Sequence, residues 1–121
     1  MRTRPDIVTE LAVGDRTVHL DEHGFLVDPD EWNIAVAEAL AARQNITLGD
    51  VHWEVIGFMR DYLAEHGVAA DARFVMRHLD ERAAVRGTTG RDLLFELFPY
   101  GYVGQACRIA GMRQPRAWST G

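Results

Sequence analysis

Two short stretches near the start of the chain alternate between apolar and polar positions and are rich in β-branched residues. They cover residues 7–13 and 16–20, and Gly14 and Asp15 separate them. Alternation with a period of two lets a strand bury one face, and a Gly/Asp pair between two such runs is typical of a tight turn. The pattern therefore predicts a β-hairpin.

Helical spacing of apolar residues begins after the hairpin. Asp28 is a suitable N-cap, Pro29 suits the first helical position, and Glu31 follows at the distance of a capping-box partner. We expect one helix from this point. Its apolar face would comprise Trp32, Ile34, Val36, Ala39 and Leu40.

The clearest helical pattern lies in the stretch ITLGDVHWEVIGFMRDYLAEHG, and Gly67 supplies its C-terminal stop. Its apolar positions are Val55, Phe58, Met59, Tyr62 and Leu63. A further helix is predicted for residues 71–84. Its inward face would comprise Phe74, Val75, Leu79 and Ala83.

Two shorter apolar segments complete the pattern. The segment RDLLFELF predicts a short helix, and YVGQACRIA predicts about two more turns that end at Gly111. With 121 residues, the chain has room for one compact domain with one core. We expect a small helical bundle with an N-terminal β-hairpin over residues 1–111.

Residues 112–121 contain Pro115 and show no periodicity. They predict a mobile C-terminal arm, unless Trp118 docks on the body of the protein. The chain from Gln105 onward is basic, because it contains Arg108, Arg113 and Arg116 and no acidic residue. Residues 1–104 carry ten arginines and eighteen acidic residues, so their formal charge is −8. The three arginines are candidate partner-binding residues.

The sequence has no run of eighteen uncharged apolar residues, and its first ten residues, MRTRPDIVTE, lack the apolar block of a signal peptide. We therefore expect a cytoplasmic protein without membrane contact. Five histidines are present, but none occurs in a metal-ligand pattern, and a GxxxxGK[ST] phosphate loop is absent. No metal and no cofactor is expected. His52, near a predicted helix start, is interpreted as a capping or packing residue.

The single cysteine, Cys107, is the strongest candidate for chemistry. Because it has no partner thiol in the chain, its redox chemistry must involve another molecule. A position at the start of a short helix next to Arg108 would lower its pKa and activate it as a nucleophile. Alternatively, Cys107 packs as a small hydrophobic residue in the run Val103, Cys107 and Ala110. Spacing alone leaves both interpretations open.

Three separated motifs carry a resemblance to a known family. HWEVIGFMRDYLAEHG, LLFELFPYG, and QACRIAGM followed by QP resemble the DsrC/TusE sulfur-relay proteins, and DEHGFLVDPDEWNIAVAEALA extends the similarity to about residues 16–115. The resemblance implies a mainly α, orthogonal and helix-turn-helix-like bundle with an N-terminal hairpin and a flexible C-terminal arm. It also implies that sulfur is carried between proteins as a cysteine persulfide or trisulfide.

The sequence departs from the family pattern at the arm. Family members carry up to two arm cysteines, one in the QACRIAG-like segment and one as the second-to-last residue. Cys107 matches the first, but Trp118 stands where the second would fall, so an intramolecular trisulfide is impossible. The tRNA-thiolation members use the cysteine that this chain lacks. In addition, Tyr102, Val103 and Gly104 replace a Pro-Ala-Lys-like segment that carries a basic residue.

Two functions remain open from the sequence. In the first, Cys107 exchanges persulfide or mixed disulfide with sulfur-donor and sulfur-acceptor proteins. In the second, the bundle is a regulatory module of sulfur metabolism that binds DNA or a protein. Binding to DNA is the weaker of these options, because the acidic body opposes contact with phosphates.

Overall fold

The computed structural model describes residues 8–113. The described chain begins with an antiparallel hairpin of β1 (Thr9–Val13) and β2 (Arg16–Leu20), joined through Gly14, whose φ is +62°. Val18 and Leu20 alternate on the buried face of β2, as the period of two requires. The predicted hairpin is confirmed.

The helix expected from Asp28 is divided into two pieces. Asp28 caps only a short 3-10 helix, η1 (Pro29–Glu31), because Trp32 then takes an extended backbone conformation. Helix α1 (Ile34–Ala42) begins after Asn33, whose side-chain oxygen accepts a hydrogen bond from the Val36 N–H at 2.9 Å. The expectation of one continuous helix was wrong, and Ile34, assigned to the apolar face, is 63% exposed.

Glu31 does not close a capping box. Its carboxylate accepts a hydrogen bond from the backbone N–H of His19 at 2.9 Å, and its second oxygen lies 3.0 Å from Nδ1 of the His19 ring. These contacts tie η1 to β2. The capping-box prediction failed because Glu31 finds its partner twelve residues away in the sequence.

Helix α2 (Asp50–His66) spans the centre of the molecule and ends at Gly67, which has a φ of +75°. His52 acts as the expected capping residue. Its Nδ1 accepts a hydrogen bond from the Gly49 N–H at 3.1 Å, which leaves Nε2 to donate to the carbonyl oxygen of Leu97 at 2.9 Å. The start of α2 is thereby hydrogen-bonded to Leu97, the last residue of helix α4 (Gly90–Leu97).

Helices α3 (Ala72–Val85) and α4 (Gly90–Leu97) pack tightly against each other at one end of the molecule. Gly90 makes this approach possible, because a Cβ atom there would lie 1.9 Å from the carbonyl oxygen of Met76. The Gly90 N–H also donates to the carboxylate of Asp80 at 3.0 Å. Phe74, expected to face inward on α3, is instead 38% exposed.

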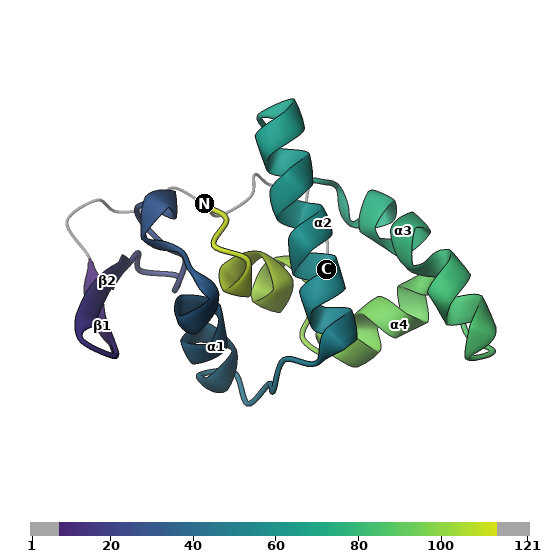
Figure 1. The fold of residues 1–121 in the computed structure, drawn as a ribbon, viewed down its shortest axis with the longest axis horizontal. Helices are drawn as coiled ribbons and strands as arrows, with labels where there is room; N and C mark the ends of the chain where they lie inside the picture. Colours follow the sequence, from purple (N-terminus) through teal and green to yellow (C-terminus); the bar gives the residue numbers. More distant parts are fainter. Residues whose placement is uncertain (1–7, 114–121) are drawn as a thin grey trace.

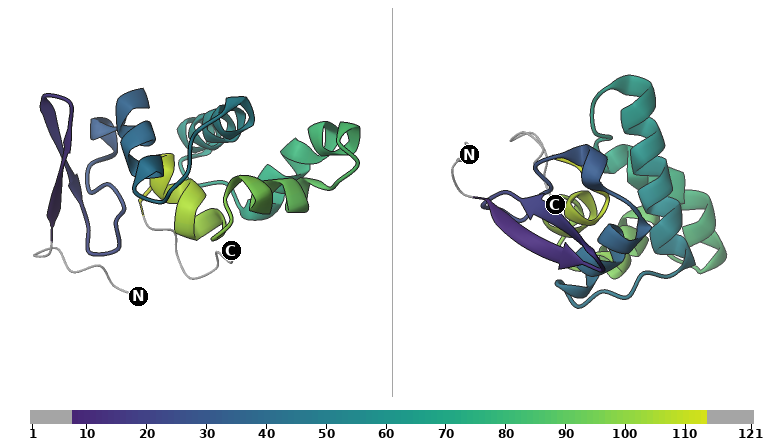
Figure 2. Two further views of the ribbon diagram at one scale, coloured as in Figure 1. Left: turned by 90° about the horizontal axis from the view of Figure 1, so that it is seen from below. Right: turned by 60° about the vertical axis from the view of Figure 1, so that its left-hand side comes forward.

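The last described segment occupies the middle of the fold. It forms a π-helix, η2 (Tyr102–Cys107), which continues as a short α-helical turn and lies between α1 and α2 (Figures 1 and 2). The hairpin lies at one end of the molecule and the α3–α4 pair at the other (Figure 2). The chain is mainly helical with an N-terminal hairpin, as predicted.

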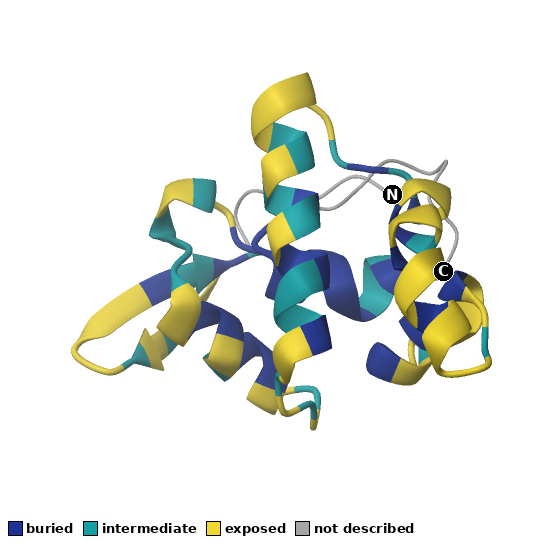
Figure 3. Cartoon of the chain, turned by 45° about the vertical axis from the view of Figure 1, so that its right-hand side comes forward, coloured by how far each residue is buried: buried dark blue, intermediate teal, exposed yellow. Residues whose placement is uncertain are grey.

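Burial extends beyond the predicted domain boundary at residue 111. Met112 is only 1% exposed and belongs to the core, whereas Arg113 is exposed. Buried positions, drawn in dark blue, also occur on each of the helices α1 to α4 (Figure 3). The prediction of an arm over residues 112–121 stays a prediction, because residues 114–121 lie outside the described part of the chain.

Two glycine-to-alanine substitutions should change stability in opposite directions. Gly90→Ala should lower the free energy of unfolding by roughly 1–3 kcal/mol, because the new methyl group forces α3 and α4 apart. Gly57→Ala, in the middle of α2 with nothing within 4 Å of its Cβ position, should raise it by about 0.5–1 kcal/mol. Urea titrations followed by circular dichroism would measure both. Equal effects of the two substitutions would contradict the packing described for α3 and α4.

Candidate functional site

Two glycines delimit the segment that carries Cys107. Gly101, with a φ of +99°, donates its N–H to the carbonyl oxygen of Phe98 at 2.9 Å and starts the π-helix. Gly111, with a φ of +79°, ends the helical segment against Trp32. A Cβ atom at Gly111 would lie 2.4 Å from Cδ1 of that ring, so only glycine fits this position.

Cys107 is fully buried, at 0% exposure. It lies at the last position of the π-helix and not at the start of a helix. Burial in these apolar surroundings raises the pKa of the Cys107 thiol to about 12. The expected lowering of this pKa is therefore wrong for the structure described here, and the packing interpretation of Cys107 is the one that the structure matches.

Tyr102 is the polar neighbour of the thiol. A π-helix brings residues five apart into register, and this relation holds between Tyr102 and Cys107. The Tyr102 hydroxyl donates to the carbonyl oxygen of Ala70 at 2.5 Å, and its interaction with Cys107 partly offsets the effect of burial on the pKa of the cysteine. Burial, followed by the interaction with Cys107, raises the pKa of Tyr102 as well. Sequence reasoning missed Tyr102 because an i, i+5 relation is not expected in a regular helix.

Arg108 does not face the thiol. Its Nε donates to the carbonyl oxygen of His23 at 2.8 Å, Nη1 donates to the carbonyl oxygen of Gly104, and the guanidinium lies 4.9 Å from the centre of the Phe25 ring. Arg108 thus fastens the C-terminal segment to the turn after β2. Arg113 is exposed at the end of the described chain, and Arg116 lies outside the described residues.

Two residues that sequence reasoning did not select for the site hold the C-terminal segment in place. Trp32 Nε1 donates to the carbonyl oxygen of Ile109 at 2.9 Å, and Arg60 Nη1 donates to that of Ala110 at 2.7 Å. The Arg60 guanidinium also lies 3.8 Å from the centre of the Trp32 ring. Burial lowers the pKa of Arg60. The sequence gives no signal for this arrangement, because its members are separated by up to 77 positions.

Within residues 8–113, no group of three or more histidine, cysteine, aspartate or glutamate side chains is arranged to hold a metal ion. Among the same residues, no helix is both long and apolar enough to cross a membrane.

The family model described as "DsrC like protein" matches residues 12–117. Among curated proteins, the chain is 35% identical to Sulfurtransferase TusE of Buchnera aphidicola over 95 residues, which are 78% of this chain and 82% of that protein. It is also 35% identical to the Sulfurtransferase TusE homolog of Haemophilus influenzae over 105 residues, 87% of this chain and 95% of the relative.

The comparison with solved structures indicates the same family. The fold is similar to the oxidized gamma subunit of dissimilatory sulfite reductase (DsrC) from Archaeoglobus fulgidus, with a TM-score of 0.81 and 38% identity over 90% of this chain and 98% of that chain. The NMR structure of Allochromatium vinosum DsrC has a TM-score of 0.78 and 30% identity, covering 92% of this chain and 98% of that one. The chain belongs to the DsrC/TusE family of sulfur-relay proteins.

The raised pKa of Cys107 predicts a dependence of stability on alkaline pH. Because the thiol titrates at a higher pH in the folded than in the unfolded state, its contribution is fully present below the unfolded-state pKa of about 8.5–9 and is lost as the pH rises toward 12. Compared with Cys107→Ala, the unmodified protein should lose up to about 1.4 kcal/mol more unfolding free energy per pH unit in this window. Paired urea titrations between pH 8 and 11 would measure the difference. Parallel pH profiles would contradict the burial of the thiol.

Proposed function

We propose that this chain is a sulfur-relay protein in which Cys107 takes sulfur from a donor protein and passes it to an acceptor. The observation that carries the proposal is the position of Cys107, the only cysteine, in the QACRIAG segment of a DsrC/TusE family member. The substrate is sulfane sulfur held as a protein persulfide. Neither a metal nor an organic cofactor is needed for the exchange.

The exchange consists of two thiol–persulfide displacements. The Cys107 thiolate attacks the outer sulfur of the donor persulfide, a new S–S bond forms, and the donor departs as a thiolate. An acceptor thiolate then attacks the outer sulfur on Cys107 and restores the original thiolate. Each step exchanges one S–S bond for another, so no external oxidant or reductant is consumed.

Burial of Cys107 means that the exchange needs a local opening. With a pKa of about 12, roughly one molecule in 10⁵ would carry the thiolate at pH 7. Displacement of Tyr102 from Ala70 would uncover the thiol and remove the cause of the raised pKa. Donor or acceptor proteins that bind the opened segment would then activate Cys107, whereas the free protein would keep it protected from adventitious oxidation.

Incubation with a protein persulfide donor should add about 32 Da to the intact chain, the mass of one sulfur atom. Cys107→Ser should abolish the addition without changing the circular dichroism spectrum, and deletion of residues 114–121 should leave loading nearly unchanged. Intact-mass spectrometry measures each result. Tyr102→Phe, which removes the hydrogen bond to Ala70, should accelerate loading because the closed state loses a stabilising contact.

Loading that survives in Cys107→Ser, or that disappears with the C-terminal deletion alone, would contradict the assignment of Cys107. Absence of loading in the unmodified protein and in Tyr102→Phe would instead favour the second function, a regulatory binding module. Burial of the thiol at 0% exposure favours this alternative, because a binding module needs no accessible thiol.

If the alternative holds, the partner should be a protein and not DNA. Two arginines of α3 are already paired within the structure, Arg73 with Asp71 and Arg82 with Glu54. Together with the acidic body, this pairing leaves little charge for phosphates. Fluorescence anisotropy with a labelled 20-base-pair duplex in about 50 mM salt should show no saturation below about 10 μM protein. Saturation below that concentration would instead indicate that DNA is the partner.

A further inference from the structure

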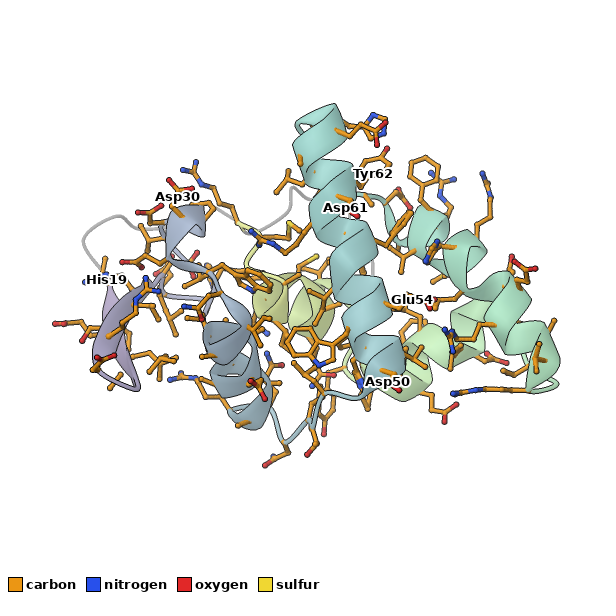
Figure 4. The ribbon with its side chains drawn as sticks, viewed as in Figure 1. His19, Asp30, Asp50, Glu54, Asp61 and Tyr62 are labelled. Atoms are coloured by element: carbon orange, nitrogen blue, oxygen red, sulfur yellow. The ribbon has the colours of Figure 1, made fainter. Side chains whose placement is uncertain are left out.

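The β1–β2 hairpin has one covered edge, on the side of β2. The N–H of His19 donates to the Glu31 carboxylate at 2.9 Å, and the carbonyl oxygen of His19 accepts from the Val27 N–H at 3.0 Å. An isolated bridge between Leu20 and Leu26 continues this contact. Both backbone groups of His19, which is labelled in Figure 4, therefore point away from β1.

This arrangement fixes the direction of the backbone groups of β1. His19 lies opposite Glu10, and Thr17 lies opposite Ala12. In an antiparallel ladder, directly opposed residues either exchange two hydrogen bonds or exchange none, and the two kinds of pair alternate. Because His19 forms its bonds on the other side, Glu10 and Ala12 direct their N–H and C=O groups to the outer edge of β1. Within residues 8–113, no strand pairs with that edge.

The outer edge of β1 is also accessible. The hairpin lies at one end of the molecule (Figure 2), and the side chains of Glu10 and Ala12 are exposed. A proline or a bulge commonly prevents an edge strand from pairing, but the strand Thr9–Val13 contains neither, and Glu10 is its single charged residue. The edge can therefore accept another strand.

The β1 sequence is complementary to itself when two copies run antiparallel about a two-fold axis at Leu11. In this register Glu10 of each copy faces Ala12 of the other, and each of these pairs can exchange two backbone hydrogen bonds. The partly buried Leu11 faces Leu11 of the second copy in the closer, non-bonded type of pair. A register centred on Glu10 would instead oppose two like charges, which is destabilising.

We propose that β1 pairs with β1 of a second copy of this chain, antiparallel and centred on Leu11, so that the two hairpins form one four-stranded sheet. The assembly closes at two copies, because the outer edge of each β2 is covered by its own chain. One short strand buries less than the roughly 1,200 Å² of a stable interface, so we expect a dissociation constant on the order of 10⁻⁴ M. The proposal does not depend on sulfur exchange at Cys107.

Sedimentation equilibrium between about 20 μM and 1 mM protein, in about 150 mM salt, tests the association. The average mass should rise with concentration from that of one chain toward that of two. Ala12→Lys should tighten the association about two- to tenfold, because the new ammonium group faces Glu10 of the second copy, and Ala12→Glu should weaken it by a similar factor. Ala84→Lys and Ala84→Glu, at an exposed position of α3, change the net charge equally and should leave it unchanged.

Amide hydrogen exchange separates the two sides of β1. The N–H groups of Glu10 and Ala12 should exchange roughly threefold more slowly at 1 mM than at 20 μM protein. Those of Leu11 and Val13 face β2 in the single chain and should not change with concentration.

Engineered cysteines test the register. Leu11→Cys should give a disulfide-linked dimer on mild oxidation, because the Cα atoms of a non-bonded pair lie about 4.5 Å apart. Val13→Cys, two residues from the axis, should not. The native Cys107 does not compete, since it is 0% exposed. Circular dichroism would verify that each variant remains folded.

A mass that stays at that of one chain up to 1 mM would overturn the proposal. Equal effects of the two Ala12 substitutions, or matching effects of the Ala84 substitutions, would show that another surface or the net charge controls the association. Slow exchange of the Glu10 and Ala12 amides at both concentrations would assign the β1 edge to a segment of the same chain. A dimer that forms equally well with Val13→Cys would contradict the register.

Discussion

The fold depends on the way in which two side chains hold the buried end of the C-terminal segment. A helix that ends in the interior leaves carbonyl oxygens without partners, and an unsatisfied buried carbonyl costs roughly 1–3 kcal/mol. Trp32 and Arg60 donate to the consecutive carbonyls of Ile109 and Ala110, and their own side chains stack on each other. Since Trp32 precedes α1 and Arg60 belongs to α2, these bonds place the segment between the two helices.

The properties of Cys107 follow from that placement. Once the segment is fixed between α1 and α2, the apolar side of η2 must face the core, and the thiol is removed from water. Desolvation then raises the pKa of the thiol, and the interaction with Tyr102 offsets part of that rise. A reactive state of this thiol is consequently a state in which part of the C-terminal segment has moved. The same contacts that stabilise the fold set the free energy needed for that movement.

The sequence correctly predicted the elements that begin or end at signals only a few residues away in the chain. The hairpin around Gly14, the helix that stops at Gly67 and the helix capped by Asp71 all have start or stop signals within a few residues. The predictions that failed concern partners distant in the sequence. Glu31 binds His19 of the hairpin, and Arg108 binds the carbonyl of His23, 85 positions away. Cys107 was identified as the candidate, but a two-turn apolar run is equally compatible with an exposed and a buried thiol, so its burial required the tertiary structure.

An aromatic residue near the end of the arm changes what the arm can do. A thiol near the tip serves by leaving the body and entering another protein, and any stable contact with its own body would hinder it. An indole does no sulfur transfer, but its large apolar face gains free energy by being covered. In this chain, therefore, any sulfur chemistry falls to the thiol of Cys107 in the core.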